Sequence, residues 1–240
     1  MSASAVLGLA AGGTLAREKA IVSPGLGRRL RLAFEVVLFF IGAPIAVTFA
    51  LHELRLPLFV VLQPILLAFI AYLLWDQTFN VKRELSRGFG LKELVFILLT
   101  FSVLGGAVAL MTSRLFPALF LEFPRERPRM WLTVMLLYPI LSVFAQEFVY
   151  RTFFFHRYGP LFGSWRWLAI LVNGALFGFA HIVFGNWVAI AGSFVFGLLF
   201  AYRYERTRSL WAVWLEHSLY GCLVFTVGLG RFFFTGVPAF

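Results

Sequence analysis

Seven apolar stretches of about 20 residues follow one another along this chain, and they constrain its fold more than any other feature. About 20 apolar residues are what a helix needs to cross a hydrocarbon layer of ~30 Å. The composition agrees, because 61% of the residues are hydrophobic and only 13% are charged, with a mean hydropathy of +0.87. The predicted spans are 33–51, 57–75, 93–112, 131–151, 166–184, 187–203 and 209–228. We therefore predict an all-α, polytopic transmembrane helical bundle of about seven helices.

The start of the chain is the one segment that does not resemble a membrane span. Residues 1–29 contain only a short apolar run, with no basic region ahead of it, so they make a poor signal peptide. We predict that 1–29 form a flexible N-terminal tail and that 30–240 form a single transmembrane domain.

The end of the fourth span and the loop before it leave two details open, including a possible eighth helix. The fourth span is expected to continue to Tyr158, where Gly159 and Pro160 stop it. The loop Arg114–Arg129 contains several prolines and leaves room for a re-entrant or interfacial helix around 116–123.

The net charge of +10 is explained by the loops between the spans. With the N-terminus inside, fifteen of the 21 lysines and arginines lie on the inner side and six on the outer side. This bias predicts a cytoplasmic N-terminus. No RNA- or DNA-binding module is visible, so we expect the lipid bilayer and no nucleic acid as a partner. The single cysteine, Cys222, lies in an apolar stretch and is interpreted as packing.

Three ionisable residues lie inside the predicted spans: Glu147, His181 and His217. A charged group at the centre of a bilayer costs roughly 2.5–3.5 kcal/mol on insertion scales, so such residues usually have a use. Helical rise places the three at overlapping depths, in the cytoplasmic half to the middle of the membrane. One acid and two imidazoles are the parts of a water-activating site. Each residue alone also fits a structural role, as a buried ion pair or an interhelical hydrogen bond.

Local spacing adds predicted contacts around the acid and the second histidine. Glu147 and Arg151 are four residues apart, so they share a helix face and can form an ion pair. On the last span His217 shares a face with Tyr220, whereas Glu216 points elsewhere. Glu216 is therefore interpreted as a structural acid.

The fifth span carries two stripes. Asn173, Phe177 and His181 are stacked at four-residue spacing. Gly174 and Gly178 form a stripe of small residues beside them, which lets another helix backbone come close. This helix is predicted to be central in the bundle.

Three motifs occur in order on these spans. They run Gln146-Glu147-Phe148-Val149-Tyr150-Arg151, Phe177-Gly178-Phe179-Ala180-His181 and His217-Ser218-Leu219-Tyr220-Gly221. Together they resemble the signature of the CAAX-protease and bacteriocin-processing (CPBP, or Abi) family of intramembrane proteases. That signature is Glu-Glu-x-x-x-Arg, then Phe-x-x-x-His, then His followed four residues later by Asn or Asp. The resemblance covers roughly 131 to 229.

Two positions depart from the family signature. Gln146 stands where the family has the first glutamate, which is usually given the water-activating role. Gly221 stands where the family has asparagine or aspartate. Asn173 and Tyr220 are the candidates to replace the lost hydrogen-bond donor.

The resemblance implies roles for the remaining residues. Glu147 and His181 would polarise and deprotonate a water. His217 would stabilise the tetrahedral oxyanion or hand a proton to the leaving amine. Arg151 would hold Glu147 ionised and oriented.

The same residues also bear on metal binding. Two histidines and a glutamate are the ligand set of many catalytic zinc sites, but the His-Glu-x-x-His spacing is absent. Arg151 would compete with a cation for the Glu147 carboxylate. We therefore predict no cofactor, with zinc held by Glu147, His181 and His217 as the alternative.

The predicted function is hydrolysis of a peptide bond in a membrane-associated protein or peptide, by an intramembrane endopeptidase of the CPBP type. The implied location is a bacterial plasma (inner) membrane, with several passes. A catalytically silent family member that binds or protects a membrane partner is the first alternative. A proton-coupled transporter is the second, because buried Glu and His also form proton relays.

Overall fold

The computed structural model describes residues 25–55, 64, 67–69, 71–72 and 75–234. Within these residues the regular structure is helical and contains no strand, which confirms the predicted all-α class. Among the described residues, five helices are long and apolar enough to cross a membrane by length and composition. They are Leu26–His52, Leu91–Leu115, Pro128–Arg157, Arg166–Phe184 and Trp187–Thr207.

These five helices overlap five of the predicted spans, with ends that differ by several residues. The first begins at Leu26 and not near residue 33, so the end of the predicted tail is already helical. Most of the predicted span 57–75 lies outside the described residues. The predicted span 209–228 is the helix α13 (Leu210–Thr226), which has 17 residues and falls short of the other five in length.

Two of the long helices contain π-helical turns. The first consists of α1 (Leu26–Val37), the π turn η1 (Leu38–Gly42) and α2 (Ala43–His52). The helix Pro128–Arg157 contains α7 (Pro128–Tyr138), η2 (Pro139–Val143), α8 (Phe144–Glu147), η3 (Phe148–Phe153) and α9 (Phe154–Arg157). This helix does continue to Arg157, as predicted, and the short helix α10 (Gly159–Phe162) follows Tyr158. Wider turns of this kind occur most often at functional sites.

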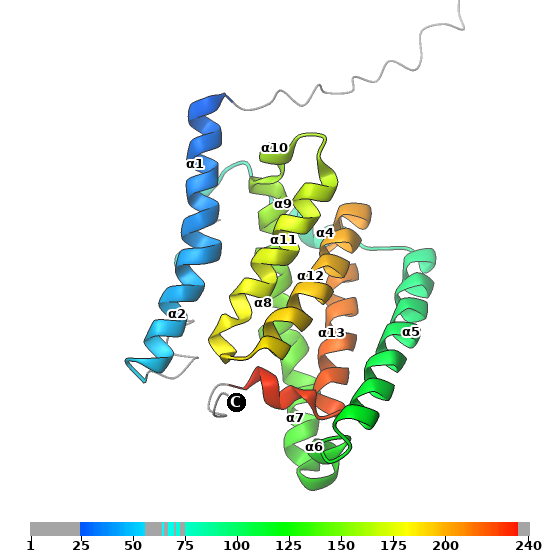
Figure 1. Cartoon of the computed structure of the whole chain (residues 1–240). Coiled ribbons are helices and arrows are strands. Elements are labelled where there is room, and N and C mark those ends of the chain that lie inside the picture. The colour runs from blue at the N-terminus through cyan, green and yellow to red at the C-terminus, as the bar shows by residue number, and fades with distance from the viewer. Residues whose placement is uncertain (1–24, 56–63, 65–66, 70, 73–74, 235–240) are drawn as a thin grey trace, which may run out of the picture.

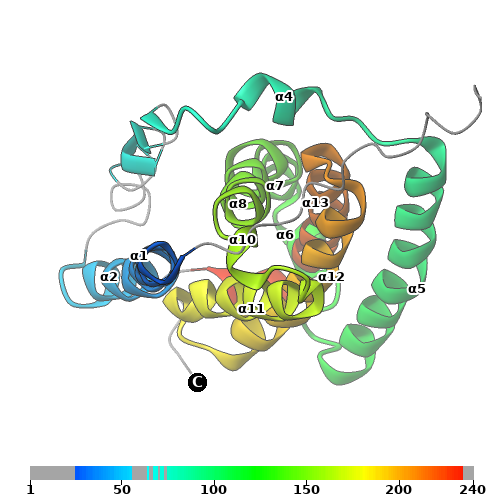
Figure 2. The same cartoon turned by 90° about the horizontal axis from the view of Figure 1, so that it is seen from above.

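The elements form a central group of helices with one helix on each flank (Figures 1 and 2). The centre holds α7–α9, α11 (Arg166–Ala180), α12 (Trp187–Thr207) and α13. The joined helix α1–α2 lies on one flank and α5 (Leu91–Leu115) on the opposite flank. The short helix α4 (Val81–Ser86) lies on the segment that leads to α5.

Short helical segments complete the described chain. The 3₁₀ turn η4 (His181–Phe184) follows α11, and η5 (Leu229–Phe233) follows α13. The loop Arg114–Arg129, which left room for an eighth helix, contains α6 (Glu122–Glu126). This helix has five residues and is far too short to span a membrane.

Small residues let α11 and α12 pack closely, as the glycine stripe predicted. A Cβ atom on Gly174 would lie 2.6 Å from Leu198 Cδ2, and one on Gly178 would lie 2.8 Å from Phe194 Cβ. Real Cβ atoms do not approach that closely, so only glycine fits at both positions. Gly197 returns the contact from α12, where its Cβ would meet the Phe177 ring at 3.1 Å.

Apolar side chains fill the interior and also cover the outside. Phe153, Phe154 and Tyr158 are fully buried at the centre of the largest hydrophobic cluster. On α5, by contrast, Leu99 and Val103 are 60% and 70% exposed. Outward-facing leucine and valine on a long helix suit lipid tails and not water.

Buried and partly buried ion pairs connect the helices. Arg157 makes two hydrogen bonds to the Glu35 carboxylate, at 2.9 and 3.1 Å, which ties α9 to α1. Arg203 on α12 makes two hydrogen bonds of 2.9 Å to Glu216 on α13 and one of 2.9 Å to Glu93 on α5. Glu216, interpreted as structural from the sequence, is thus paired with arginine, and so is Glu35.

Candidate active site

Glu147 ends α8 and is fully buried. It lies near the middle of the helix Pro128–Arg157, away from both ends. A carboxylate in this position needs partners, because an ionised carboxylate without them is strongly disfavoured in an apolar interior. The structure provides one partner on the same helix and one on another helix.

The partner on another helix is His217 of α13. Its Nδ1 atom lies 2.7 Å from Glu147 Oε1. Since an ionised carboxylate only accepts hydrogen bonds, Nδ1–H donates and Nε2 carries the lone pair of the neutral ring. The Tyr138 hydroxyl lies 3.2 Å from Nε2 and donates to it. The Phe200 ring stacks on the imidazole, with centroids 4.7 Å apart.

The partner on the same helix is Arg151, which lies one turn beyond Glu147 in the π turn η3. Arg151 Nε is 3.3 Å from Glu147 Oε2, which confirms the predicted ion pair. Both side chains have no exposed surface. The guanidinium also lies 4.6 Å from the centroid of the Phe177 ring, within cation–π range.

Asn173 of α11 holds this arginine in place. Its Oδ1 accepts a 2.8 Å hydrogen bond from Arg151 Nη1, and its Nδ2 donates to the Tyr150 carbonyl at 2.6 Å. The second bond satisfies a backbone carbonyl in the π turn. Asn173 was predicted as a replacement donor at the reacting centre, but its side chain is engaged with Arg151 and the backbone.

The Glu147–Arg151 pair leaves polar atoms without hydrogen bonds. Glu147 Oε2, Arg151 Nε and Arg151 Nη2 have no hydrogen-bond partner among the described residues, although all three are buried. Buried polar atoms nearly always have a partner, so unpaired ones call for a functional explanation. An acceptor and donors gathered at one place can hold a small polar molecule such as water.

His181 lies at the junction of α11 and η4, close to this group but not hydrogen-bonded to it. Its Nδ1–H donates to the Phe177 carbonyl at 2.7 Å, which leaves the lone pair on Nε2. The Phe177 ring contacts both imidazoles, with centroids 4.9 Å from His181 and 5.7 Å from His217. Of the three predicted catalytic residues, Glu147 and His217 are in direct contact. His181 is linked to His217 by the Phe177 ring between them.

Two predicted supporting residues point away from the acid. Gln146 donates a 2.7 Å hydrogen bond to Ser142 Oγ on its own helix. The Tyr220 ring packs against Phe101 and Phe196, with centroids 5.3 and 4.6 Å away. Tyr220 therefore packs between α5 and α12, and it shares the Phe200 ring of α12 with His217, at centroid distances of 6.2 and 4.7 Å.

Tyr138 was missed by the sequence reasoning. It is nine positions before Glu147, which in a regular α-helix puts the two on opposite faces, about 180° apart. The π turn η2 lies between them and takes an extra residue, which rotates Tyr138 by about 100° toward the Glu147 face. Only Pro139, the first residue of that turn, hinted at an irregular helix.

The metal alternative requires Glu147, His181 and His217 to surround one ion. The Nδ1 atoms of His181 and His217 are engaged with the Phe177 carbonyl and Glu147, so these rings would bind a metal through Nε2. Within the described part of the chain, no group of three His, Cys, Asp or Glu residues is placed to hold a metal ion. The absence of a cofactor remains a prediction, and zinc remains its alternative.

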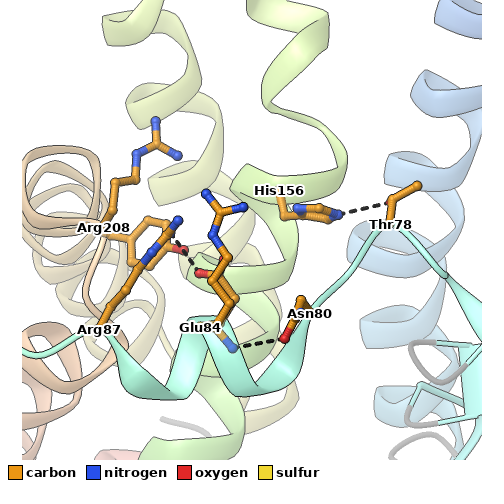
Figure 3. A pocket seen from close by; sticks show the side chains of 8 residues that line it. Thr78, Asn80, Glu84, Arg87, His156 and Arg208 are labelled. Carbon is orange, nitrogen blue, oxygen red and sulfur yellow. Dashed lines mark hydrogen bonds and ion pairs between the residues drawn. The ribbon is translucent and has the colours of Figure 1, made fainter.

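A separate pocket lies at the end of the bundle that carries α4 and α9 (Figure 3). Its volume is about 150 Å³. His156 lines it, about 13 Å along the helix from Glu147, so the pocket is distinct from the buried acid. The other lining residues are Thr78, Asn80, Arg83, Glu84, Arg87, Tyr204 and Arg208.

The long apolar helices and the acid buried among them define a multi-pass membrane protein with a polar centre. Residues 128–223 match the family model described as type II CAAX prenyl endopeptidase Rce1-like. The matched segment contains Glu147, Arg151, His181 and His217, and the match agrees with the resemblance of the motifs to CAAX proteases. No curated protein and no solved structure matches the chain. The family supports a membrane peptidase of the CAAX type in general.

Proposed function

We propose that this chain hydrolyses a peptide bond of a membrane-associated protein or peptide, with a water activated by Glu147. One observation carries the proposal. The Glu147 carboxylate is held by His217 at Oε1 and by Arg151 at Oε2, yet Oε2 accepts no hydrogen bond from a described residue. An oriented carboxylate with one free acceptor position is suited to take a proton from water.

Each step of the reaction has a residue to serve it. Glu147 Oε2 accepts the proton as the water oxygen bonds to the peptide carbonyl carbon. His217 keeps the carboxylate oriented through Oε1. The Arg151 charge stabilises the negative charge that develops on the carbonyl oxygen. When the C–N bond breaks, Glu147 returns the proton to the leaving amine.

His181 supplies a second acceptor for the same water. Its Nδ1–H is fixed by the Phe177 carbonyl, which turns the basic Nε2 away from the backbone. The proposal uses no metal. Neither the proposal nor the motifs imply a prenyl group on the substrate.

A second candidate function is a silent relative that binds a membrane partner. Two observations favour it. Gln146 replaces the family's first acid, and Glu147 and Arg151 have no exposed surface, so a substrate must part the surrounding helices to reach them. The Gln146→Glu variant separates the two candidates, because it restores the family pattern. We expect it to retain or raise cleavage, whereas a binder would show none.

The test of the proposed function is a comparison of membrane proteomes. Cells with the natural chain and with Glu147→Ala are compared for an uncleaved precursor, and the variant is checked for insertion and folding. We expect one precursor to accumulate in the variant. Identical proteomes from a well-folded Glu147→Ala protein would reject hydrolysis by Glu147 and favour the binding function.

Orientation in the bacterial inner membrane is part of the proposal, and the loop charges support a cytoplasmic N-terminus. Ser86 and Glu126 are exposed and end the helices α4 and α6, which lie toward opposite ends of the bundle (Figure 1). In a Cys222→Ser background, Ser86→Cys should label from the cytoplasm and Glu126→Cys from outside. The reverse pattern would invert the orientation, and labelling from one side would overturn the number of crossings.

A further inference from the structure

The Gly221 position faces a neighbouring side chain. A Cβ atom built on Gly221 would lie 2.6 Å from the Tyr138 hydroxyl oxygen and 2.8 Å from Tyr138 Cζ. Such distances are too short for any real side chain. The Tyr138 ring therefore occupies the volume that the side chain of an asparagine at 221 would enter.

The same tyrosine reaches the functional histidine. Its hydroxyl is 3.2 Å from His217 Nε2, and the two rings meet edge to face at 6.3 Å. The Phe225 ring packs against Tyr138 in an edge-to-face contact at 5.1 Å. Packing on both sides fixes the ring, so the hydroxyl has a defined place.

The hydroxyl completes a chain of hydrogen bonds. Tyr138 O–H donates to His217 Nε2, and His217 Nδ1–H donates to Glu147 Oε1. The carboxylate fixes the proton on Nδ1, and the hydroxyl donates to the lone pair that this tautomer leaves on Nε2. Outer partners of this kind set the orientation of a working histidine.

We propose that Tyr138 is a positioning residue of the site, which takes over from α7 the place and the polar role left open by Gly221 on α13. Its hydroxyl holds the His217 ring in the orientation that keeps Glu147 ready for the water. The effect on cleavage rests on the proposed function, whereas the hold on His217 does not. The two other candidates are engaged elsewhere, Asn173 with Arg151 and Tyr220 with Phe101 and Phe196.

The first test removes only the hydroxyl. Tyr138→Phe should lower cleavage per folded molecule by about 2- to 10-fold, the worth of one neutral hydrogen bond. Tyr220→Phe is the matched control and should cleave at the natural rate. ¹⁵N spectra of labelled histidine side chains provide a second readout, and the chain has only four histidines to assign. We expect the His217 Nε2 resonance to shift in Tyr138→Phe, because this atom loses its donor, and to stay unchanged in Tyr220→Phe.

The second test exploits the shared volume. Gly221→Ala should displace the Tyr138 ring and lower cleavage at least as much as Tyr138→Phe. In a Tyr138→Ala background the same alanine should cost nothing further, because the clash is gone. Gly221→Asn in that background should recover part of the lost cleavage. Gly192→Ala, where a Cβ meets no atom within 4 Å, controls for the cost of replacing a helical glycine.

The readouts separate the two claims. If the natural chain cleaves nothing but Tyr138→Phe shifts the His217 Nε2 resonance, the proposed function fails and the positioning role stands. If cleavage is present but Tyr138→Phe alters neither the rate nor the ¹⁵N spectrum, the positioning role is overturned. Equal losses from Gly221→Ala with and without Tyr138 would also overturn it, because the two positions would then be independent.

Discussion

Two buried glutamates in this bundle each face a buried arginine, but only one of them has both carboxylate oxygens hydrogen-bonded. Glu147 and Glu216 both have no exposed surface, and each faces a fully buried arginine, Arg151 or Arg203. Glu216 receives two 2.9 Å hydrogen bonds from its arginine and a third, of 3.3 Å, from Thr100. Glu147 receives none from its arginine, which approaches at 3.3 Å without hydrogen-bond geometry.

The difference shows what a buried ion pair contributes in each place. A carboxylate gripped at both oxygens is fixed, and it ties α13 to α12. A carboxylate held by an imidazole at one oxygen, with the other left unpaired, retains an acceptor for chemistry. Burial alone does not distinguish these two acids; the number of hydrogen-bonded carboxylate oxygens does.

The largest effect should come from removing His217, because only Glu147 of the two glutamates is hydrogen-bonded to an imidazole. We expect His217→Ala to lower cleavage per folded molecule by 10²- to 10⁴-fold, the usual range for a positioned acid–base group. Folding should survive, because Arg151 still balances the Glu147 charge. Cleavage rates and thermal unfolding in detergent measure the two effects separately. A variant that unfolds, or one that cleaves normally, would remove the distinction between the two glutamates.

Arg203→Ala should break the ion pair between Arg203 and Glu216. It leaves Glu216 buried without a counter-ion, which typically costs about 3–5 kcal/mol of unfolding free energy. Chemical unfolding in detergent measures this loss. Arg206→Ala is the control, since Arg206 is half exposed and makes one 3.1 Å bond to Glu93. We expect only a small loss for that surface pair. Similar losses from the two arginines would show that the Glu216 pair is not the structural anchor.

A smaller effect is expected from the helix that supports Arg151. In Gly178→Ala the new Cβ would lie 2.8 Å from Phe194 Cβ and 3.0 Å from Phe194 Cα, so α11 and α12 must separate slightly. Overpacking of this kind costs about 1–3 kcal/mol. Gly192→Ala on α12 has open space and should be neutral or slightly stabilising. Thermal unfolding compares the two variants, and equal midpoints would contradict the close packing of α11 and α12.

Much of this arrangement follows from sequence because helical periodicity is local. The four-residue spacing of Glu147 and Arg151 predicted their ion pair. The stripe of Gly174 and Gly178 predicted the close helix contact. The same periodicity placed Glu216 off the His217 face, where it is found paired with Arg203.

The rest depends on departures from that periodicity and on distant residues. The position of Tyr138 depends on a π turn, which residue spacing does not reveal. The shared helix face places Tyr220 near Phe200, which also contacts His217, but it does not indicate that the ring turns toward Phe101. The partner of Asn173 is on another helix, and sequence could not distinguish Arg151 from a substrate there.

The most direct test of the central claim is a paired rate measurement on Glu147→Gln and Glu216→Gln. Each change keeps the side-chain size and removes one buried charge. Purified proteins in lipid nanodiscs are given a peptide that spans the cleavage site of the precursor found by proteomics, and rates are expressed per folded molecule. The account predicts that Glu216→Gln loses stability but cleaves near the natural rate, and that Glu147→Gln does not cleave. Near-natural cleavage by Glu147→Gln would contradict it.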